Sequence, residues 1–322
     1  MTLANRLRRT MPAPLKALSR VRCDKWLLAA CCLLAATSVW QITQLESDLA
    51  DAKLRVLNAA QHQVMTYLTS NLPQAVRQWY SYLPVEIDTL NDLDQNDPSL
   101  IRHVRKRSLV PPSDRSVAYN LRKSDKPTNS TLVKTLLKIF VNKTSGFFVE
   151  SRALDGEEMS VTLELERNKK WDGLLIEPDP SNFQKMLATN RKCWLAPVCL
   201  STENTPILTK VSVSGLKRGE GTVDVHCLPL ASLLIALNST VVDLLRLDLN
   251  GDELPVLETI SFDSVFIAAI SVKFAHGRTR KETMRNFVEG KGYKLYKVNK
   301  TIDLWSDEDY LFIKDDSGLP TM

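Results

Sequence analysis

The stretch GFFVESRALDGEEMSVTLELERNKKWDGLLIEPDP, residues 146–180, decides the fold of this chain. It contains two short apolar runs, Phe147–Val149 and Leu174–Ile176, and each run ends on a carboxylate. A segment of helical period separates the two runs. The pattern therefore predicts a strand, a turn, a helix and a second strand.

Acidic residues follow both predicted strands. Glu150 and Asp155 come after the first strand, and Glu177 comes after the second. Because the carboxyl ends of parallel strands face the ligand crevice, we expect these three side chains on one rim. Glu177 lies roughly twenty residues after the first turn, where nucleotide-binding sheets place an acid on the ribose hydroxyls. The alternative is a pair of buried strands whose ends are merely solvated.

Several motifs resemble the FkbM-type methyltransferase domain, in the form carried by the arthropod Star and Star-like membrane proteins. They are GFFVESRALDGE, LLIEPDP and NRKCWLAPVCLS, followed in the same order by VHCLPLASLLIALNSTVVDLLRLDLNGDELPVLETI and ISVKFAHGRTRKETMRNFVEGKGYKL. The resemblance covers most of Ser145–Lys314. It implies an α/β, Rossmann-like domain of the S-adenosylmethionine-dependent methyltransferase type, with S-adenosylmethionine as its cofactor.

The resemblance also implies a set of site residues. Methyl transfer from this cofactor requires a glycine-containing backbone cradle, an acid for the ribose and a crevice that aligns the acceptor with the sulfonium. Asp248 ends a later strand near the methyl donor, and His276 is suited to act as a general base, with a structural role as the alternative. The candidate cofactor-binding residues are Glu150, Arg152, Asp155, Gly156, Glu177 and Ser201.

Three departures from the family pattern fall at strand ends. Arg152 replaces a glycine, Asn250 replaces the usual glutamate, and Lys273 replaces an acid. Two like charges at ~4 Å cost from about one to several kcal/mol, and losing glycine at a strained turn costs about 1 kcal/mol or more. We therefore expect an affinity for the sulfonium cofactor that is lower by orders of magnitude. The alternatives are a side chain that points to solvent or a register shifted by one residue.

The chain begins with a basic tail, residues 1–25, followed by the uncharged run WLLAACCLLAATSVWQI, residues 26–42. A run of about 17 apolar residues lies at the lower edge of what spans a bilayer, and its tryptophans suit the two interfaces. The run predicts a transmembrane helix, with a cleaved signal peptide as the alternative. Because the positive charge precedes the span, we expect a type II protein whose remaining residues are lumenal or extracellular.

Glycosylation sequons and cysteines agree with this topology. Cys199 and Cys227 stand where the family motifs also carry cysteine, and an oxidising lumen would permit a disulfide between them. No cysteine spacing resembles a zinc site, so we expect no structural metal. The sequons lie beyond the span, at Asn129, Asn142, Asn238 and Asn299.

Residues 43–130 are expected to form a lumenal stalk and linker. Apolar residues between Ile42 and Ala59 recur in steps of three and four, which predicts a helix that either forms a homodimer or packs on the domain. The polar, proline-containing residues 92–126 favour a linker or a loosely packed cap. A basic cluster within them predicts a solvated loop, or else a proprotein-convertase site; it comprises Arg102, Arg105, Lys106 and Arg107.

Residues 131–322 are expected to form one domain with a mostly parallel sheet and helices on both faces. The predicted strands are 147–149, 174–176, 195–200, 208–213, 241–249, 268–274 and 310–313, and the predicted helices are 157–168, 182–190, 230–237, 254–259 and 280–291. The net charge is +5, and the basic tail supplies more than that. The lumenal part is therefore near neutral, which argues against nucleic-acid binding.

The membrane span, the type II orientation, the sequons and the three departures favour a non-catalytic membrane protein of the secretory pathway, similar to Star. Its expected role, as in Star, is to assist endoplasmic reticulum-to-Golgi and endosomal trafficking of transmembrane cargo such as growth-factor precursors. We expect it in the endoplasmic reticulum, Golgi, endosome or plasma membrane. One alternative is an active methyltransferase that acts on a lumenal glycan or lipid hydroxyl. Another is a Golgi-resident glycan-processing partner with the same topology.

Overall fold

A computed structural model of the chain describes residues 90–122, 130–214, 221–274, 281–300 and 308–320. All of them belong to one compact unit, Leu68–Met322. The expected transmembrane helix at 26–42 and the stalk up to residue 89 lie outside the described residues. Within those residues, no helix has both the length and the apolar character needed to cross a membrane.

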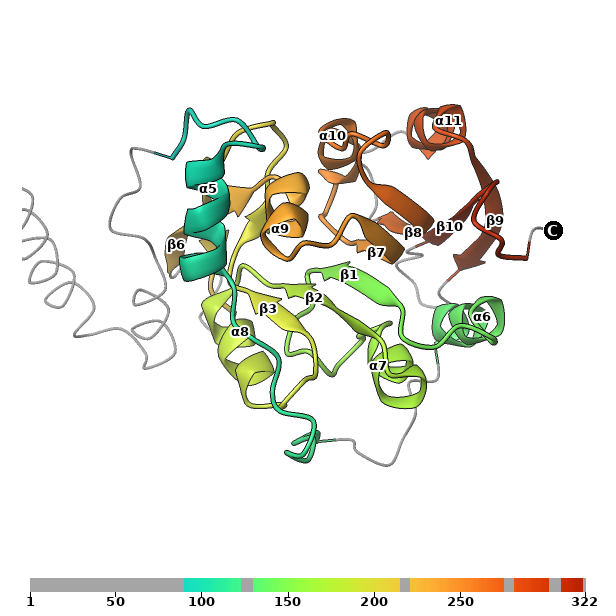
Figure 1. Ribbon diagram of the computed structural model, residues 1–322, viewed down its shortest axis with the longest axis horizontal. Helices are drawn as coiled ribbons and strands as arrows, with labels where there is room; N and C mark the ends of the chain where they lie inside the picture. The colour runs from blue at the N-terminus through green and yellow to red at the C-terminus, as the bar shows by residue number, and fades with distance from the viewer. Residues whose placement is uncertain (1–89, 123–129, 215–220, 275–280, 301–307, 321–322) are drawn as a thin grey trace, which may run out of the picture. The chain divides into compact units, whose positions relative to one another are not determined.

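A seven-stranded sheet forms the centre of this unit, in the order β3-β2-β1-β7-β8-β10-β9 (Figure 1). The pairs from β3 to β8 are parallel, whereas β10 runs antiparallel to both of its neighbours. The mostly parallel sheet that the sequence predicts is therefore confirmed. The strands are β1 (Phe147–Ser151), β2 (Asp172–Ile176), β3 (Trp194–Ala196), β7 (Val241–Leu247), β8 (Phe266–Phe274), β9 (Tyr293–Lys300) and β10 (Glu308–Lys314).

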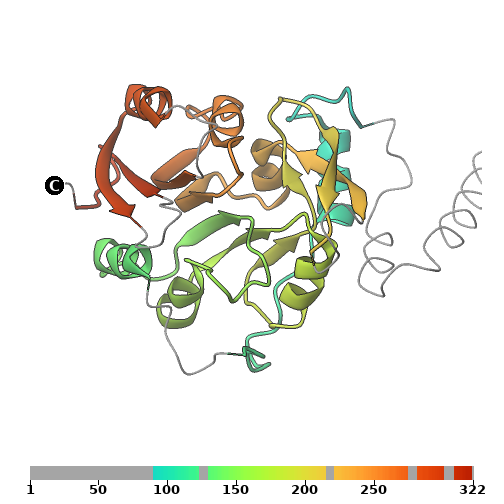
Figure 2. The same cartoon turned by 180° about the vertical axis from the view of Figure 1, so that it is seen from behind.

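A smaller sheet lies beside the central one and is seen from behind in Figure 2. Its strands are β4 (Cys199–Leu200), β5 (Ile207–Ser212) and β6 (Thr222–Leu228), in the order β4-β6-β5. The single strand expected at 195–200 is wrong, because it is divided between the two sheets at Pro197, which has no backbone N–H to donate to a ladder. Cys199 and Cys227 form a disulfide that joins β4 to β6.

Helices cover both faces of the central sheet (Figure 1). Side chains alternate along each strand, so Phe148 packs in one apolar core and Val149 in the other. The core that contains Phe148 is covered by α6 (Thr131–Ile139), α7 (Leu163–Lys169) and α8 (Pro180–Leu187). The core that contains Val149 is covered by α5 (Pro98–His103), α9 (Leu230–Ala236), α10 (Glu253–Glu258) and α11 (Lys281–Gly290).

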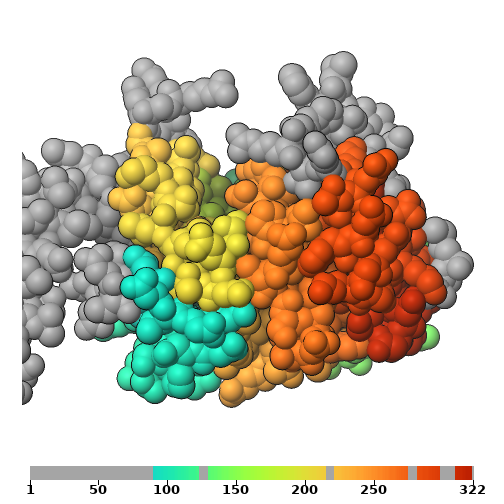
Figure 3. Space-filling model, turned by 90° about the horizontal axis from the view of Figure 1, so that it is seen from above, coloured from blue at the N-terminus to red at the C-terminus, as the bar shows by residue number. Residues whose placement is uncertain are grey.

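The segment before residue 122 is packed onto the domain. Helix α5 is followed by a π-helical turn, η2 (Val104–Ser108), and both Leu100 and Val104 are fully buried. Gln95 N–H donates to the carbonyl of Asn204 at 2.8 Å, and Figure 3 shows the cyan segment with α5 lying against the yellow segment that follows β3. The expected loose packing is therefore wrong for these residues.

The basic cluster of this segment is exposed but helical. Its residues lie on α5 and η2 instead of in the solvated loop that the sequence predicted. Arg105 Nε donates to the carbonyl of Ala236 at 2.9 Å and so fastens η2 to α9. An ordered helical turn is a poor substrate for a protease, which favours extended and mobile chain.

Candidate functional site

The loop between β1 and α7, residues 152–162, is folded around Glu150. This carboxylate is buried, and its oxygens accept hydrogen bonds from Ser160 Oγ at 2.8 Å, from Val161 N–H at 2.9 Å and from the hydroxyl of Thr162. These bonds hold the residues that lead into α7, which begins later than predicted. Glu150 therefore fixes the shape of the loop and does not face a ligand crevice.

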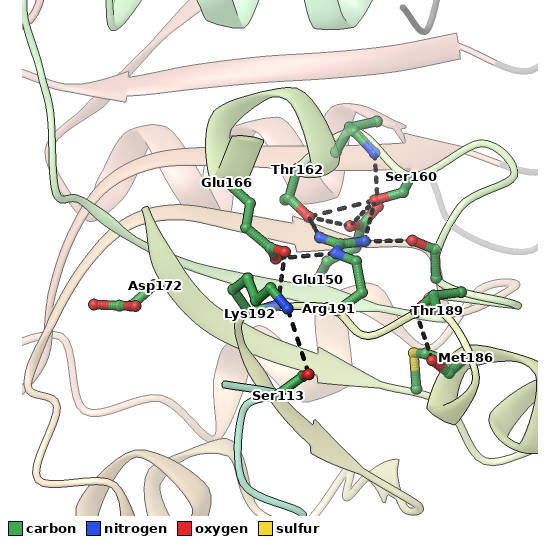
Figure 4. A network of polar contacts seen from close by, with 12 residues as sticks. Ser113, Glu150, Ser160, Thr162, Glu166, Asp172, Met186, Thr189, Arg191 and Lys192 are labelled. Atoms are coloured by element: carbon green, nitrogen blue, oxygen red, sulfur yellow. Dashed lines mark hydrogen bonds and ion pairs between the residues drawn. The ribbon is translucent and has the colours of Figure 1, made fainter. Parts of the chain in front are cut away.

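A fully buried arginine completes this polar network (Figure 4). Arg191 Nε donates to Glu166 Oε2 at 2.9 Å, and its Nη atoms donate to the carbonyl of Gly156 and to the hydroxyls of Ser160 and Thr162. Burial, the largest single effect, would lower the pKa of Arg191, but the surrounding groups, led by the Glu166 carboxylate and including Cys193 and Glu150, together outweigh it and the net shift is upward. Arg191 thus remains a cation.

Sequence reasoning missed the role of Arg191 and Glu166. The motif NRKCWL marks the position of the arginine but carries no sign of its partner, because Glu166 lies 25 residues away along the chain. The one available signal is the position of the arginine, directly before the buried strand β3. A buried charge requires a partner of opposite charge, so such an arginine predicts a buried acid elsewhere in the domain.

Asp155 and Gly156 form the tight turn of the loop. Asp155 Oδ1 accepts the N–H groups of Glu157 at 3.0 Å and Glu158 at 2.7 Å, while its other oxygen pairs with the guanidinium of Arg122. Gly156 has φ +77°, and a Cβ atom there would lie 2.7 Å from Met186 Cγ. Glycine is thus needed at this turn for backbone conformation and for space.

Glu177, the acid expected to bind the ribose, is buried at the end of β2. Its Oε2 accepts Leu154 N–H at 2.7 Å and its Oε1 accepts Asp179 N–H at 2.9 Å. Burial raises the pKa of Glu177 to about 7, against the opposing effect of these two N–H donors. Both carboxylate oxygens therefore serve to fasten the loop after β1 to the end of β2.

The three departures from the family pattern lie in one cluster, in which Arg152 and Lys273 contact Asp248 and Asn250 contacts Arg152. Arg152 Nη1 donates to Asp248 Oδ1 at 3.0 Å and to Asn250 Oδ1 at 2.9 Å. Lys273 Nζ lies 3.4 Å from Asp248 Oδ2. We call these four residues the Asp248 cluster. They lie at the ends of β1, β7 and β8, which are neighbours in the sheet.

The backbone at Arg152 is left-handed, and its side chain extends to Asp248 and Asn250 at the end of β7. Arg152 has φ +52° and Asn250 has φ +56°, a left-handed conformation that is uncommon for residues other than glycine. The Arg152 side chain is 40% exposed. Its charge also acts on Glu177, whose pKa it lowers slightly against the dominant effect of burial. Arg152 is therefore partly exposed to solvent while it also binds Asp248 and Asn250.

The structure does not bring the other predicted site residues to the Asp248 cluster. Ser201 is buried, and its hydroxyl donates to the carbonyl of Thr205 at 2.7 Å while accepting Glu203 N–H at 3.1 Å. His276 lies outside the described residues. Of the sequon asparagines, Asn142 and Asn238 are exposed, whereas Asn129 and the side chain of Asn299 lie outside the description. Across the described segments, no three His, Cys, Asp or Glu side chains gather in a way that suits a metal ion.

The charges around Asp248 do not fit S-adenosylmethionine, whereas Glu177 does not exclude it. Both oxygens of Glu177 accept backbone N–H groups, but each oxygen keeps a second lone pair for a ribose hydroxyl. Asp248 is paired with two cations of the protein itself. A positive sulfonium beside Arg152 and Lys273 would be repelled by both.

The sheet order defines the class of this domain. The order reverses between β1 and β7, where open α/β sheets bind ligands, and a single antiparallel strand is inserted near one edge. This is the Rossmann-like α/β fold of S-adenosylmethionine-dependent methyltransferases. Residues 150–295, somewhat less than half of the chain, match the family model described as the methyltransferase FkbM domain.

Solved structures of methyltransferases are similar to this chain at low identity and low TM-score. M. capricolum TrmK in complex with S-adenosyl-homocysteine is 12% identical with a TM-score of 0.34, and the match covers 58% of this chain and 69% of that one. A TehB-like SAM-dependent methyltransferase from Corynebacterium glutamicum is 12% identical with a TM-score of 0.36, covering 60% and 91%. Human methyltransferase 10 domain containing protein is 11% identical with a TM-score of 0.35, covering 69% and 98%. TM-scores this low carry no conclusion about substrate or cofactor. No curated protein matches the chain.

Proposed function

We propose that this chain is a non-catalytic, methyltransferase-fold protein of the secretory pathway. It is anchored in the membrane by residues 26–42, with the domain on the lumenal side, and it uses the fold as a binding platform for transmembrane cargo. The observation that carries the non-catalytic part is the Asp248 cluster. A cation of the protein, Arg152, lies on the carboxylate that the family places near the methyl donor.

Two further observations support the compartment. The Cys199–Cys227 disulfide belongs to an oxidising environment, which agrees with a lumenal domain. The sequon residues Asn142 and Asn238 are exposed and thus accessible to glycan transfer. The cargo role, in which the protein assists the trafficking of growth-factor precursors, rests on the resemblance to Star, since fold alone does not determine function.

The alternative function is an active methyltransferase that modifies a lumenal glycan or lipid hydroxyl. The match of residues 150–295 to the FkbM domain favours it. In that case Arg152 would have to leave Asp248. This step breaks an ion pair of the cluster, which is unfavourable.

Isothermal titration calorimetry separates the two functions. The full-length chain, purified in a mild detergent, is titrated with S-adenosylmethionine. We expect no saturable heat, because the crevice already holds its own cations. Saturable binding in the micromolar range would contradict the non-catalytic function and support the enzyme.

Affinity capture from secretory membranes tests the carrier role. The full-length chain with an epitope tag is expressed in cells and recovered from detergent-solubilised endoplasmic reticulum and Golgi membranes. We expect transmembrane growth-factor precursors to be enriched over a tagged type II protein of unrelated fold. If no membrane cargo is enriched over this control, the carrier function is wrong, even if the calorimetry shows no cofactor binding.

A further inference from the structure

We propose that the Asp248 cluster is a binding site for an oxyanion, a phosphate or sulfate group, in place of a sulfonium cofactor. The inference rests on the proposed function in one respect: the crevice does not hold S-adenosylmethionine. It adds the chemical class of the ligand, which follows from the charge, the donors and the backbone of the cluster.

The charge of the cluster favours an anion. Arg152 and Lys273 share one carboxylate, so these two cations and Asp248 together carry a net charge of +1. Glu177 is the other acid on which the Arg152 charge acts. Its two oxygens are turned away toward the N–H groups of Leu154 and Asp179, so they leave Arg152 to other acceptors.

The donors of Arg152 favour an oxyanion over a simple halide. A guanidinium carries five N–H donors, and both hydrogen bonds of Arg152 come from Nη1. Among the described residues, no acceptor is found for its Nε or Nη2. That edge presents two parallel N–H groups, which match two oxygens of a phosphate or sulfate. The side chain as a whole is 40% exposed, so Arg152 is accessible from solvent.

The backbone of the cluster is left-handed at two positions. Arg152 and Asn250 both adopt positive φ, a conformation that is uncommon for arginine and that asparagine tolerates better. The conformation brings the two side chains together from the ends of β1 and β7. Ligand sites in open α/β sheets lie at these carboxyl ends, so the position as well as the chemistry suits a ligand.

Calorimetric titration with inorganic anions tests the proposal. Full-length chain in mild detergent is titrated with sodium phosphate and, separately, with sodium sulfate, each against sodium chloride at the same ionic strength. We expect saturable binding of at least one oxyanion and none of chloride. The stronger of the two oxyanions then distinguishes a phosphorylated from a sulfated natural ligand.

Variants locate the site. Arg152→Gln and Lys273→Gln should each weaken oxyanion binding about tenfold or more, because each removes a charge-assisted contact. Arg115→Gln is the matched control, since Arg115 is an exposed arginine paired with Asp172 at the amino end of β2. Circular dichroism melting shows whether each variant is folded, and Lys273→Gln keeps the test decisive if the Arg152 variant does not fold.

Two results would overturn the proposal. Binding of neither oxyanion above chloride would mean that the Asp248 cluster is only a structural ion cluster. Equal weakening by Arg115→Gln would mean that the anions bind the surface without a site. Both results leave the non-catalytic function standing if S-adenosylmethionine does not bind, so the two failures are distinguishable.

Discussion

Individual acids in this domain bind the protein's own backbone where a methyltransferase would use them for its cofactor. Glu150 accepts Val161 N–H, and Glu177 accepts the N–H groups of Leu154 and Asp179. Their positions in the sequence predict a rim of ligand-binding carboxylates. The hydrogen bonds depend on how the loop after β1 folds back on the strand ends, which sequence spacing does not contain.

Glu177 should make stability depend on pH. Its pKa is about 7 when folded and 4.5 ordinarily, so between these values the folded state binds more protons than the unfolded state. The free energy of unfolding should therefore fall by up to about 3 kcal/mol as the pH rises through this window. Urea unfolding of wild type and Glu177→Gln over this range measures the effect.

We expect Glu177→Gln to remove this pH dependence, because glutamine does not titrate. Glu158→Gln, at an exposed acid of the same loop, serves as the control and should leave it unchanged. An equal slope in wild type and Glu177→Gln would show that another group is responsible.

Arg191 and Glu166 should contribute to the free energy of unfolding as a coupled pair. Arg191→Met leaves Glu166 as a fully buried carboxylate without its cation, which should cost about 3–5 kcal/mol. The double variant Arg191→Met/Glu166→Leu should be less destabilised than the single one. Chemical denaturation of the two variants decides the matter, and a double variant that is worse than the single would contradict a coupled pair.

At the scale of elements, the sequence predicts the central strands well and the edges poorly. β1, β2, β7 and β8 are buried apolar runs, and each is found close to its predicted place. β6 was missed because Thr222 and Asp224 are exposed while Val223 and Val225 are buried, so no continuous apolar run marks it. β9, which lies at the sheet edge, was missed as well.

The candidate site shows the same limit of sequence reasoning. The sequence identifies Arg152, Asn250 and Lys273 as separate departures at strand ends. It does not predict that Arg152 and Lys273 both reach Asp248 while Asn250 binds Arg152, because this requires the register of β7 against β8. That register pairs Leu247 with Val272, which brings Asp248 and Lys273 side by side at the next position.

The contact between α5 and β6 should weaken in acid. His226 on β6 is buried, and its ring nitrogens have no hydrogen-bond partner within the described part of the chain. Burial and then the charge of His103 on α5 hold the pKa of His226 below its ordinary value of 6.5. The unfolded state therefore binds the proton at a higher pH than the folded state does. Protonation of His226 should lower the free energy of unfolding as the pH falls below about 6.5.

Thermal unfolding of wild type and His226→Phe across this range measures the effect of the histidine. The difference in melting temperature between the two should grow in favour of His226→Phe as the pH falls. Because Glu177 acts in the opposite direction in an overlapping window, the comparison between variants is the informative quantity. A difference that stays constant with pH would contradict the prediction.

Lys192 should hold residues 113–120 against the edge of the central sheet. Its ammonium is buried and donates to the carbonyls of Asp114 at 2.9 Å and Val117 at 2.7 Å. Lys192→Met should therefore speed hydrogen exchange at Asn120 N–H, which donates to the carbonyl of Thr189. Lys210→Met, at an exposed lysine of β5, is the control and should leave this exchange rate unchanged. Unaltered exchange in the Lys192 variant would contradict this role.

The molecule as a whole keeps the methyltransferase fold, but positively charged residues stand at the strand ends where the family has glycine or acidic residues. The sheet, the switch point between β1 and β7 and the acids at the strand ends are present. The cation that these acids would attract is supplied by the chain itself, from residues 152 and 273, which are far apart in sequence. The fold is thus compatible with a binding role. We propose that this binding takes place in the lumen of the secretory pathway.

Restoring the family residues at the Asp248 cluster tests this central claim most directly. The variant Arg152→Gly/Asn250→Glu/Lys273→Glu and the wild type, both full length in mild detergent, are titrated with S-adenosylmethionine in a calorimeter. We predict saturable binding by the variant and none by the wild type. Equal binding by the two proteins would contradict the claim that the Asp248 cluster excludes the cofactor.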